Sequence, residues 1–347
     1  MRGVCIPEIE PIDAKRLEQL RTAAGNGPVL ILTHDNPDPD AMAAGKALAT
    51  LLEKAWGIAC HLVYQGLVAR AENKAMLSLL VPEWKQADVI ADMEQYSAIA
   101  LVDTQPGAGN NSLPDRVPPQ IVFDHHHPVR QGLDRVKFVD VRPTVGATVS
   151  LIYLYLDAAG IKPDADLATA IFYGIQADTR SLSRGDSPTD QAVYFRMLEV
   201  MDRQKLVQVE QAGLPRDYFR AFSKGLQAAR VYGKVVTVYL GAMHRPDFAA
   251  EIGDMLIRMD GVRAVLCQGY FQKKMQLSLR TRDLEDDAGL VIQQIVVAPG
   301  RAGGHGMAAG GQVPLVEEQA ADEVAADVEA RFLRLMGETG EGEPLLM

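Results

Sequence analysis

The sequence predicts an α/β protein with two domains, the first built on a parallel sheet with helices on both faces and the second a smaller mixed α/β domain. Short β-rich apolar runs alternate with helix-like segments through the first half of the chain, the order that produces parallel sheets. The 347 residues are about twice an average domain. A second, shorter succession of strands and helices begins near residue 234.

In the first half, the apolar run 28–33 predicts a strand, and the Pro/Asp loop after it ends at Asp40, which we expect to cap a helix ending near Gly57. The further strands expected in this half are 59–64, 97–102 and 120–123, and the further helices are 72–80, 84–95, 148–158 and 166–176. Because strands and helices alternate, the strands should form one buried parallel sheet.

In the second half, residues 188–230 are polar and helical, as expected of a connector. The strands expected beyond it are 234–240, 264–270 and 275–280, the helices are 247–258, 286–298 and 317–336, and glycine-rich 300–311 is expected to be a loop. The domain boundaries predicted from this pattern are 1–195, a connector at 196–230, and 231–340.

The composition excludes several protein classes. The net charge of −10 disfavours extended, non-specific binding to nucleic acid. The three cysteines form no C-x-x-C pair, which argues against a disulfide framework and a cysteine zinc site. No apolar run is long enough to cross a bilayer, and acidic residues at 8, 10 and 13 interrupt any export signal, so we expect a cytoplasmic protein.

The strongest local motif is the segment His34–Asp40, in which one imidazole and several carboxylates lie within seven residues on a proline-stiffened loop. Such ligands suit Mn²⁺, Mg²⁺, Fe²⁺ or Zn²⁺. The alternative interpretation is a plain loop in which Asp40 is a helix cap and His34 is incidental. On balance the motif favours metal binding.

Further acidic and imidazole residues follow other predicted strands. Asp103 follows one strand, and Asp124 with three consecutive histidines, 125–127, follows another. Because ligands of parallel sheets gather at the carboxyl ends of the strands, these groups should converge with His34. Asp178 ends an apolar helix, where a carboxylate is disfavoured unless a positive group lies nearby; a solvated helix end is the alternative.

These clusters together resemble the DHH phosphoesterase superfamily, in the branch that joins a DHH domain to a DHHA1 domain. The resemblance runs from about residue 28 to about residue 316. The matching motifs are His34–Ala41, Val102–Thr104, Asp124–His126, Gly174–Thr179, Ser278–Arg280 and Gly303–Gly310. In size and layout the chain is most similar to NrnA-like enzymes, which degrade very short RNA and dephosphorylate 3′-phosphoadenosine 5′-phosphate.

The resemblance implies a site for two divalent cations, Mn²⁺ in preference to Mg²⁺ or other ions. One ion would be held by His34 and Asp38, the other by Asp40, His125 and Asp178, and Asp103 would bridge both. His126 would face the scissile phosphate, and Asp124 would brace His125. In the second domain, Arg280, Gly303, Gly304 and His305 would bind substrate phosphates, the glycines through a backbone nest in the loop.

The implied activity is hydrolysis of short oligonucleotides, linear dinucleotides or 3′-phosphoadenosine 5′-phosphate by a hydroxide formed between the two cations. Residues 1–195 would be the catalytic, metal-binding domain and 231–340 the substrate-binding domain. The partners implied are short RNA or DNA or a nucleotide, with no long nucleic acid and no membrane. A homodimer is compatible with the resemblance.

Other functions are weighed against this one. A related branch hydrolyses inorganic pyrophosphate but carries a different second domain, so Gly303-Gly304-His305 argues against it. Cyclic-dinucleotide hydrolysis stays open. A non-catalytic nucleotide sensor is disfavoured because all six ligand positions are intact. One departure bears on substrate preference: Gln105-Pro106 follows the Val-Asp-Thr motif, where NrnA-like enzymes usually have Gly-Asp and then an Arg.

Overall fold

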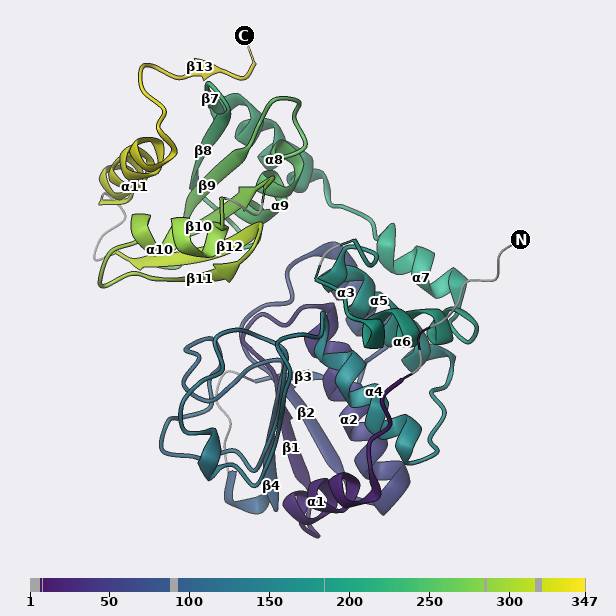
Figure 1. Ribbon diagram of the computed structural model, residues 1–347. Coiled ribbons are helices and arrows are strands. Elements are labelled where there is room, and N and C mark those ends of the chain that lie inside the picture. Colours follow the sequence, from purple (N-terminus) through teal and green to yellow (C-terminus); the bar gives the residue numbers. More distant parts are fainter. Residues whose placement is uncertain are drawn as a thin grey trace. The chain divides into compact units, whose positions relative to one another are not determined.

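The computed structural model describes residues 7, 9–87, 93–183, 185–283, 286–315 and 320–346. The chain forms two compact units, Met1–Gly213 and Leu214–Met347 (Figure 1). Of the segment expected to be a connector, α7 (Arg203–Glu210) belongs to the first unit and α8 (Arg216–Ala228) to the second. None of the described helices is both long and apolar enough to cross a membrane.

The first unit is built on a parallel sheet, as predicted. Its described strands are β1 (Val29–Leu32), β2 (Cys60–Tyr64), β3 (Lys85–Gln86), β4 (Ala98–Val102), β5 (Ile121–Asp124) and β6 (Phe138–Val141). They lie in the order β3-β2-β1-β4-β5-β6, and every neighbouring pair is parallel. The chain reverses its direction of travel across the sheet between β1 and β4, which is where such sheets bind ligands.

Both faces of this sheet are buried, which explains why its strands are continuous apolar runs. Along β1, Val29 and Ile31 point into one hydrophobic core, and Leu30 and Leu32 point into another. This alternation is the two-residue period of an extended strand.

The two faces are covered differently (Figure 1). The described α-helices of this unit pack on one face of the sheet. They are α1 (Ala14–Ala24), α2 (Pro39–Trp56), α3 (Ala71–Leu79), α4 (Thr148–Ala158), α5 (Ala165–Thr179), α6 (Pro188–Leu198) and α7. The 3-10 helices η1 (Met93–Gln95) and η2 (Leu133–Arg135) and adjoining loops cover the other face. The connection from β4 to β5 is rich in proline, glycine and asparagine, so it cannot continue as an α-helix.

Three local expectations for this unit need correction. The cap of α2 is Asp38, whose side chain accepts from the amide of Ala41 at 3.0 Å, because Pro39 takes the first helical position and leaves Asp40 inside the helix. The helix expected at 84–95 is wrong at Lys85–Gln86, which pair with the edge of β2; residues 88–92 lie outside the described part. Strand β6 was not predicted.

The second unit is a mixed α/β domain, as predicted. Its described strands are β7 (Arg230–Tyr232), β8 (Val235–Ala242), β9 (Ala264–Phe271), β10 (Lys274–Thr281), β11 (Arg301–His305), β12 (Ala308–Pro314) and β13 (Glu343–Pro344). They lie in the order β11-β12-β10-β9-β8-β7-β13, with β8 and β9 parallel and the other pairs antiparallel. The glycine-rich segment expected to be a loop is thus the hairpin of β11 and β12.

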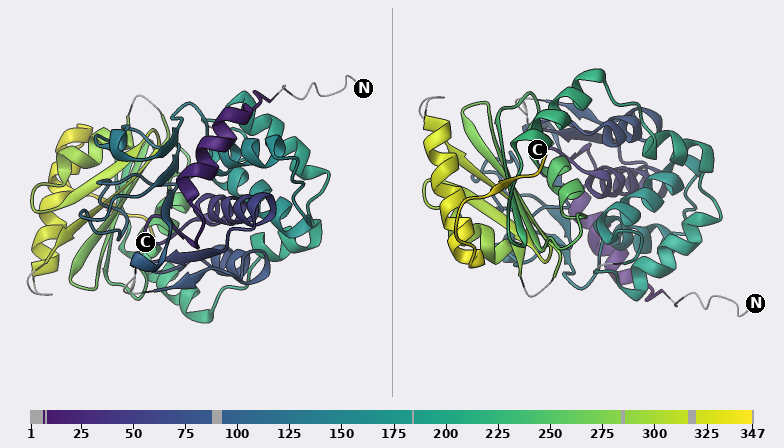
Figure 2. Two further views of the ribbon diagram at one scale, coloured as in Figure 1. Left: turned by 90° about the horizontal axis from the view of Figure 1, so that it is seen from below. Right: turned by 90° about the horizontal axis from the view of Figure 1, so that it is seen from above.

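Helices cover both faces of the second sheet. Helices α8 and α9 (Phe248–Leu256) pack on one face, where they enclose a core that includes Val236 and Val238. On the other face lie α10 (Ala288–Ile295) and α11 (Ala321–Met336), and Figure 2 shows α11 running along that face. The expected helix 317–336 is found from Ala321; its first residues lie outside the described part.

Candidate metal centre

The predicted metal ligands lie together at the carboxyl edge of the first sheet. His34, Asp103 and His125 follow β1, β4 and β5, while Asp38 and Asp40 begin α2 and Asp178 lies near the end of α5. Within the described residues, side chains able to hold a metal ion form three groups with ligand atoms no more than 4.8 Å apart. They are His34, Asp38 and Asp103; Asp40, His125 and Asp178; and Asp103, His125 and His126.

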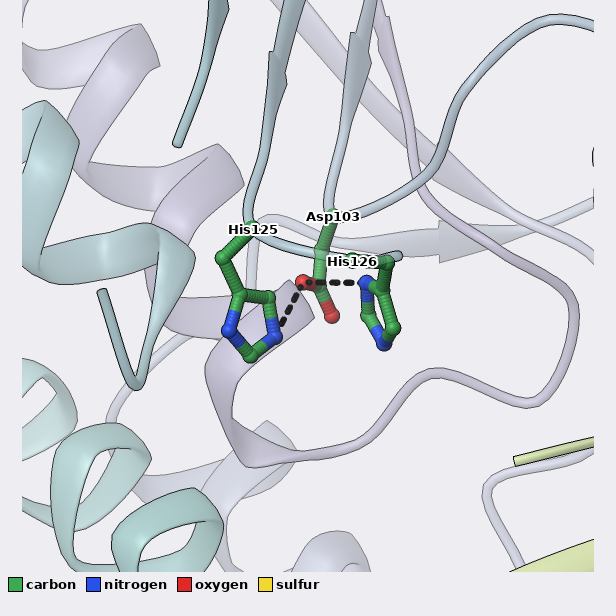
Figure 3. Close-up of side chains that lie close together, drawn as sticks. All are labelled: Asp103, His125 and His126. Atoms are coloured by element: carbon green, nitrogen blue, oxygen red, sulfur yellow. Dashed lines mark ion pairs between the residues drawn. The ribbon is translucent and has the colours of Figure 1, made fainter. Parts of the chain in front are cut away.

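Asp103 is the residue that joins these groups. It is fully buried and has a φ of 59°, a left-handed conformation that is uncommon for a residue other than glycine and typical of functional sites. Its Oδ1 accepts a hydrogen bond from Thr148 Oγ1 at 2.8 Å and lies 3.5 Å from His125 Nε2 and 3.6 Å from His126 Nδ1 (Figure 3). Its Oδ2 is buried without a hydrogen-bond partner among the described residues.

Two histidine rings are oriented by backbone carbonyls. His34 Nδ1 lies 3.0 Å from the carbonyl of Asp35, and His125 Nδ1 lies 3.1 Å from the carbonyl of Val145. A carbonyl only accepts, so each Nδ1 carries the proton and each Nε2 is left as a ligand atom. His34 Nε2 faces Asp103 Oδ2 at 3.4 Å, and His125 Nε2 faces Asp178 Oδ2 at the same distance.

Asp40 is held by the first turn of α4. Its two carboxylate oxygens accept from the amides of Thr148 and Val149 at 2.6 and 2.8 Å, where the helix end favours negative charge. Burial nevertheless raises the pKa of Asp40 well above its usual value, and the charges of Asp103 and Asp178 raise it further. The amides of the helix therefore do not fully offset the charge gathered here.

The pKa values of the neighbouring Asp103 and His126 are also shifted by the charges around them. Burial alone would raise the pKa of Asp103, but the neighbouring imidazoles of His126, His34 and His125 lower it overall. Burial would lower the pKa of His126, yet the charge of Asp103 and the hydrogen bond to Asp124 raise it to about 9. Carboxylates and imidazoles here depend on one another for charge balance.

A divalent cation fits this arrangement. Asp103 Oδ2 and His125 Nε2 are both buried and without a hydrogen-bond partner in the described structure, which is costly unless another group binds them. The lone pair of a singly protonated imidazole with its proton on Nδ1 would face carboxylate oxygens, and a cation between them makes this contact favourable. Oxygen and imidazole donors without thiolate suit Mn²⁺, Mg²⁺ or Zn²⁺.

One predicted contact is wrong. Asp124 does not brace His125: its Oδ1 accepts from Nδ1 of His126 at 2.8 Å, and the carbonyl of Val145 holds His125 instead. The reason is geometric, since residues two apart in an extended segment point the same way and adjacent ones point apart. His127 is exposed and belongs to none of the three groups.

Sequence reasoning missed two residues beside the cluster. Thr148 contributes its hydroxyl to Asp103 and its amide to Asp40. The buried Gln105 donates from Nε2 to Asp124 Oδ2 at 2.6 Å. The small residues before Thr148 hint at a helix start, but neither side chain belongs to a metal-binding type.

The predicted phosphate-binding residues lie together in the second unit. Strand register places Arg280 opposite Ala308 and Ala308 opposite His305, so these positions form one row across β10, β12 and β11. Arg280 Nε donates to Asp254 Oδ1 at 2.6 Å, and its Nη1 donates to Ser278 Oγ at 2.9 Å, which fixes the guanidinium. The side chain of His305 lies outside the described part.

The glycines predicted to form a phosphate-binding nest in a loop lie instead in the hairpin of β11 and β12, whose turn is held by hydrogen bonds. Gly303 and Gly304 pair with Gly310 and Ala309 in the β-ladder. The turn beyond them is tied to the start of α10, because the amide of Gly306 donates to Asp287 Oδ2 at 3.2 Å and the Gly306 carbonyl accepts from Ala288. These contacts give the glycine-rich segment a fixed backbone.

Several known proteins are similar to this chain in sequence. An uncharacterized protein of Methanocaldococcus jannaschii is 34% identical over 290 residues, covering 83% of this chain and 58% of that protein. A probable manganese-dependent inorganic pyrophosphatase of Streptococcus agalactiae is 25% identical over 186 residues, or 54% of this chain and 58% of that protein. The chain thus spans somewhat more than half the length of these relatives.

Two solved structures share the fold. An exopolyphosphatase-related protein from Bacteroides fragilis matches 95% of this chain and 100% of its own, with a TM-score of 0.74 and 14% identity. RecJ from Thermus thermophilus in complex with Mn²⁺ matches 97% of this chain and 57% of its own, with a TM-score of 0.52 and 16% identity. The family model described as "DHH family, N-terminal domain" matches residues 28–175, so this part of the first unit is a DHH-family domain.

Proposed function

We propose that this chain is a metal-dependent phosphoesterase that hydrolyses short oligonucleotides, 3′-phosphoadenosine 5′-phosphate, or both. The observation that carries the proposal is the buried Asp103, whose two oxygens face the imidazoles of two different ligand groups. A carboxylate shared in this way suits two adjacent cations. The DHH-family domain at residues 28–175 and the manganese dependence named for a relative support the same chemistry.

The three groups of ligand atoms described above suggest which residues would hold each cation. His34, Asp38 and Asp103 would hold one cation, and Asp103 with Asp40, His125 and Asp178 would hold the other. When bound, the cations supply Lewis acidity that makes water nucleophilic near neutral pH and offsets negative charge on phosphate.

His126 is the side chain suited to the substrate. Its Nδ1 donates to Asp124 at 2.8 Å, and its side chain is 38% exposed, so the ring is oriented yet accessible. Before a cation binds, burial lowers the pKa of His126, but the charge of Asp103 and the hydrogen bond to Asp124 raise it to about 9, which favours a ring protonated on both nitrogens. Its remaining N–H would donate to a phosphoryl oxygen and stabilise the charge that develops there.

Substrate binding is assigned to the second unit. The row of Arg280, Ala308 and His305 places a guanidinium in the same sheet as the glycine-rich hairpin of β11 and β12, and a guanidinium is suited to binding phosphate. We assign catalysis to the first unit and phosphate recognition to this row.

Hydrolysis of inorganic pyrophosphate is the second candidate. It is favoured by the 25% identity to probable manganese-dependent pyrophosphatases, which covers 54% of this chain. The Gly303-Gly304-His305 segment argues for the oligonucleotide activity, because it resembles the DHHA1 motif that pyrophosphatases of the related branch replace.

A substrate panel tests both candidates. The full chain would be assayed with Mn²⁺ on RNA of two to five nucleotides, 3′-phosphoadenosine 5′-phosphate, cyclic dinucleotides and pyrophosphate, with and without chelator. We expect chelator-sensitive hydrolysis of the first two. Faster turnover of pyrophosphate would favour the second candidate, and an inert protein at full manganese occupancy would refute both.

A further inference from the structure

Gln105 makes a set of contacts that the proposed reaction does not yet explain. Its side chain is 2% exposed. The amide Nε2 donates to Asp124 Oδ2 at 2.6 Å and to the carbonyl of His126 at 3.2 Å, and Oε1 accepts from the amide of Arg130 at 2.7 Å. One buried amide therefore ties the end of β4 to the segment that carries His126.

These contacts require a glutamine amide in one orientation. The carboxylate of Asp124 and the carbonyl of His126 only accept, while the amide of Arg130 only donates. Nε2 must face the first two and Oε1 the third. A glutamate would set two carboxylates against each other, and an apolar residue would leave Asp124 Oδ2 buried without this donor.

The main chain of Gln105 is fixed as well. Asn111 Nδ2 donates to the Gln105 carbonyl at 3.0 Å and to Thr104 Oγ1 at 3.0 Å, and Thr104 Oγ1 donates to Asn110 Oδ1 at 2.7 Å. The loop after Asp103 is thus closed on itself, so the side chain of Gln105 is presented from a rigid support.

We propose that Gln105 is a positioning residue for His126. It fixes one oxygen of Asp124, so the other stays directed at His126 Nδ1, and this keeps a proton on Nδ1 and sets the rotation of the ring. The inference rests on the proposed function, in which His126 contacts the phosphate. It explains why a glutamine follows the Val-Asp-Thr motif in this chain.

The first test compares Gln105→Leu with a matched control, Gln120→Leu. Gln120 lies in the same unit and bonds only to backbone groups in its described contacts, the Ile99 amide and the Pro118 carbonyl. We expect Gln105→Leu to lower kcat by about 10- to 100-fold with KM and bound manganese close to wild type, and the control to keep wild-type kcat. A kcat equal to that of the control, or loss of bound manganese, would overturn the assignment.

A double-mutant cycle with Asp124→Asn tests the route of the effect. If Gln105 acts through Asp124, the double variant loses little more kcat than Asp124→Asn alone. Multiplicative losses would show that Gln105 acts independently and would contradict the proposal. Gln105→Met, which is unbranched and close to glutamine in length, serves the same comparison should the leucine variant fail to fold.

A readout without turnover separates this inference from the proposed function. In ¹⁵N-labelled protein loaded with diamagnetic Mg²⁺ or Zn²⁺, the His126 Nδ1–H should be protected from exchange and visible by NMR, and it should be lost in Gln105→Leu but kept in Gln120→Leu. Retention of the signal in Gln105→Leu would refute the positioning role. Failure of the wild type to hydrolyse any phosphoester would refute the function alone.

Discussion

At the scale of single residues, Asp103 concentrates the chemistry of the site. It combines complete burial, a left-handed backbone and a carboxylate oxygen without a hydrogen-bond partner in the described structure. Each of these features costs free energy in a protein that binds nothing. Together they indicate that folding has prepared a position for positive charge.

Replacing Asp103 with Asn should abolish the proposed hydrolysis and reduce bound manganese. The amide keeps the shape of the carboxylate but removes the charge shared by both ligand groups, so we expect kcat to fall by about 10³-fold or more. Activity assays and metal analysis measure the two effects. Asp35→Asn is the control, because Asp35 lies on the same loop but in none of the ligand groups; equal losses in both variants would contradict a shared ligand.

At the scale of elements, α4 couples the fold to the site. Its first turn gives two amides to Asp40 and the Thr148 hydroxyl to Asp103. Residues 108 positions apart in the sequence are joined here. The helix therefore orients carboxylates that arrive from two other elements.

Removing the Thr148 hydroxyl tests this coupling. Thr148→Val keeps the side-chain shape but leaves Asp103 Oδ1 without its donor, so we expect a loss of about 1–3 kcal/mol in unfolding free energy and weaker manganese binding. Urea unfolding and metal titration measure these changes. Thr50→Val, which removes only a hydroxyl bonded to the carbonyl of Lys46 in its own helix, should cost less and leave metal affinity unchanged. Equal effects of the two variants would show that the Asp103 contact is unimportant.

The sequence predicts a helix or strand only where the residues of that segment themselves carry the pattern that marks it. Apolar period and order predicted β1, β4 and β5, and with them the convergence of His34, Asp103 and His125. The same pattern could not reveal β11 and β12, because glycine-rich strands lack the side chains that mark a strand, and their pairing depends on β10 far along the chain. Gln105 was visible only as a departure from a motif, since its role depends on partners that folding supplies.

The hairpin of β11 and β12 gives a further prediction. Gly304 has a φ of 144°, and a Cβ there would lie 2.4 Å from Ala309 Cα, whereas a Cβ at Gly303 would meet nothing within 4 Å. Gly304→Ala should therefore destabilise the second unit by about 1–3 kcal/mol, and Gly303→Ala should cost much less. Chemical unfolding monitored by circular dichroism compares the pair. Similar stabilities would show that the hairpin yields to the added methyl group.

At the scale of the whole molecule, the described carboxylates that could bind metal are concentrated in the first unit. The net charge is −10, and four of the carboxylates, Asp38, Asp40, Asp103 and Asp178, lie within the ligand groups of the first unit. Their mutual repulsion opposes folding unless a cation offsets it. The second unit contains none of the described ligand groups, so metal should stabilise the two units unequally.

Metal removal tests this asymmetry, because the chain carries a built-in probe. Its two tryptophans, Trp56 and Trp84, both belong to the first unit, and Trp84 is buried with its Nε1 donating to the carbonyl of Met42 at 3.0 Å. Tryptophan fluorescence therefore follows the first unit. Manganese at about 100 times its dissociation constant should stabilise that unit by about 2.7 kcal/mol, so chelation should lower the fluorescence-detected Tm. Cobalt or magnesium would restore it by an amount that grows with the logarithm of the ion concentration divided by its dissociation constant. A fluorescence Tm indifferent to chelator would mean that the ligand groups hold no cation in solution, and it would contradict a metal site at Asp103, whose Oδ2 has no hydrogen-bond partner in the described structure.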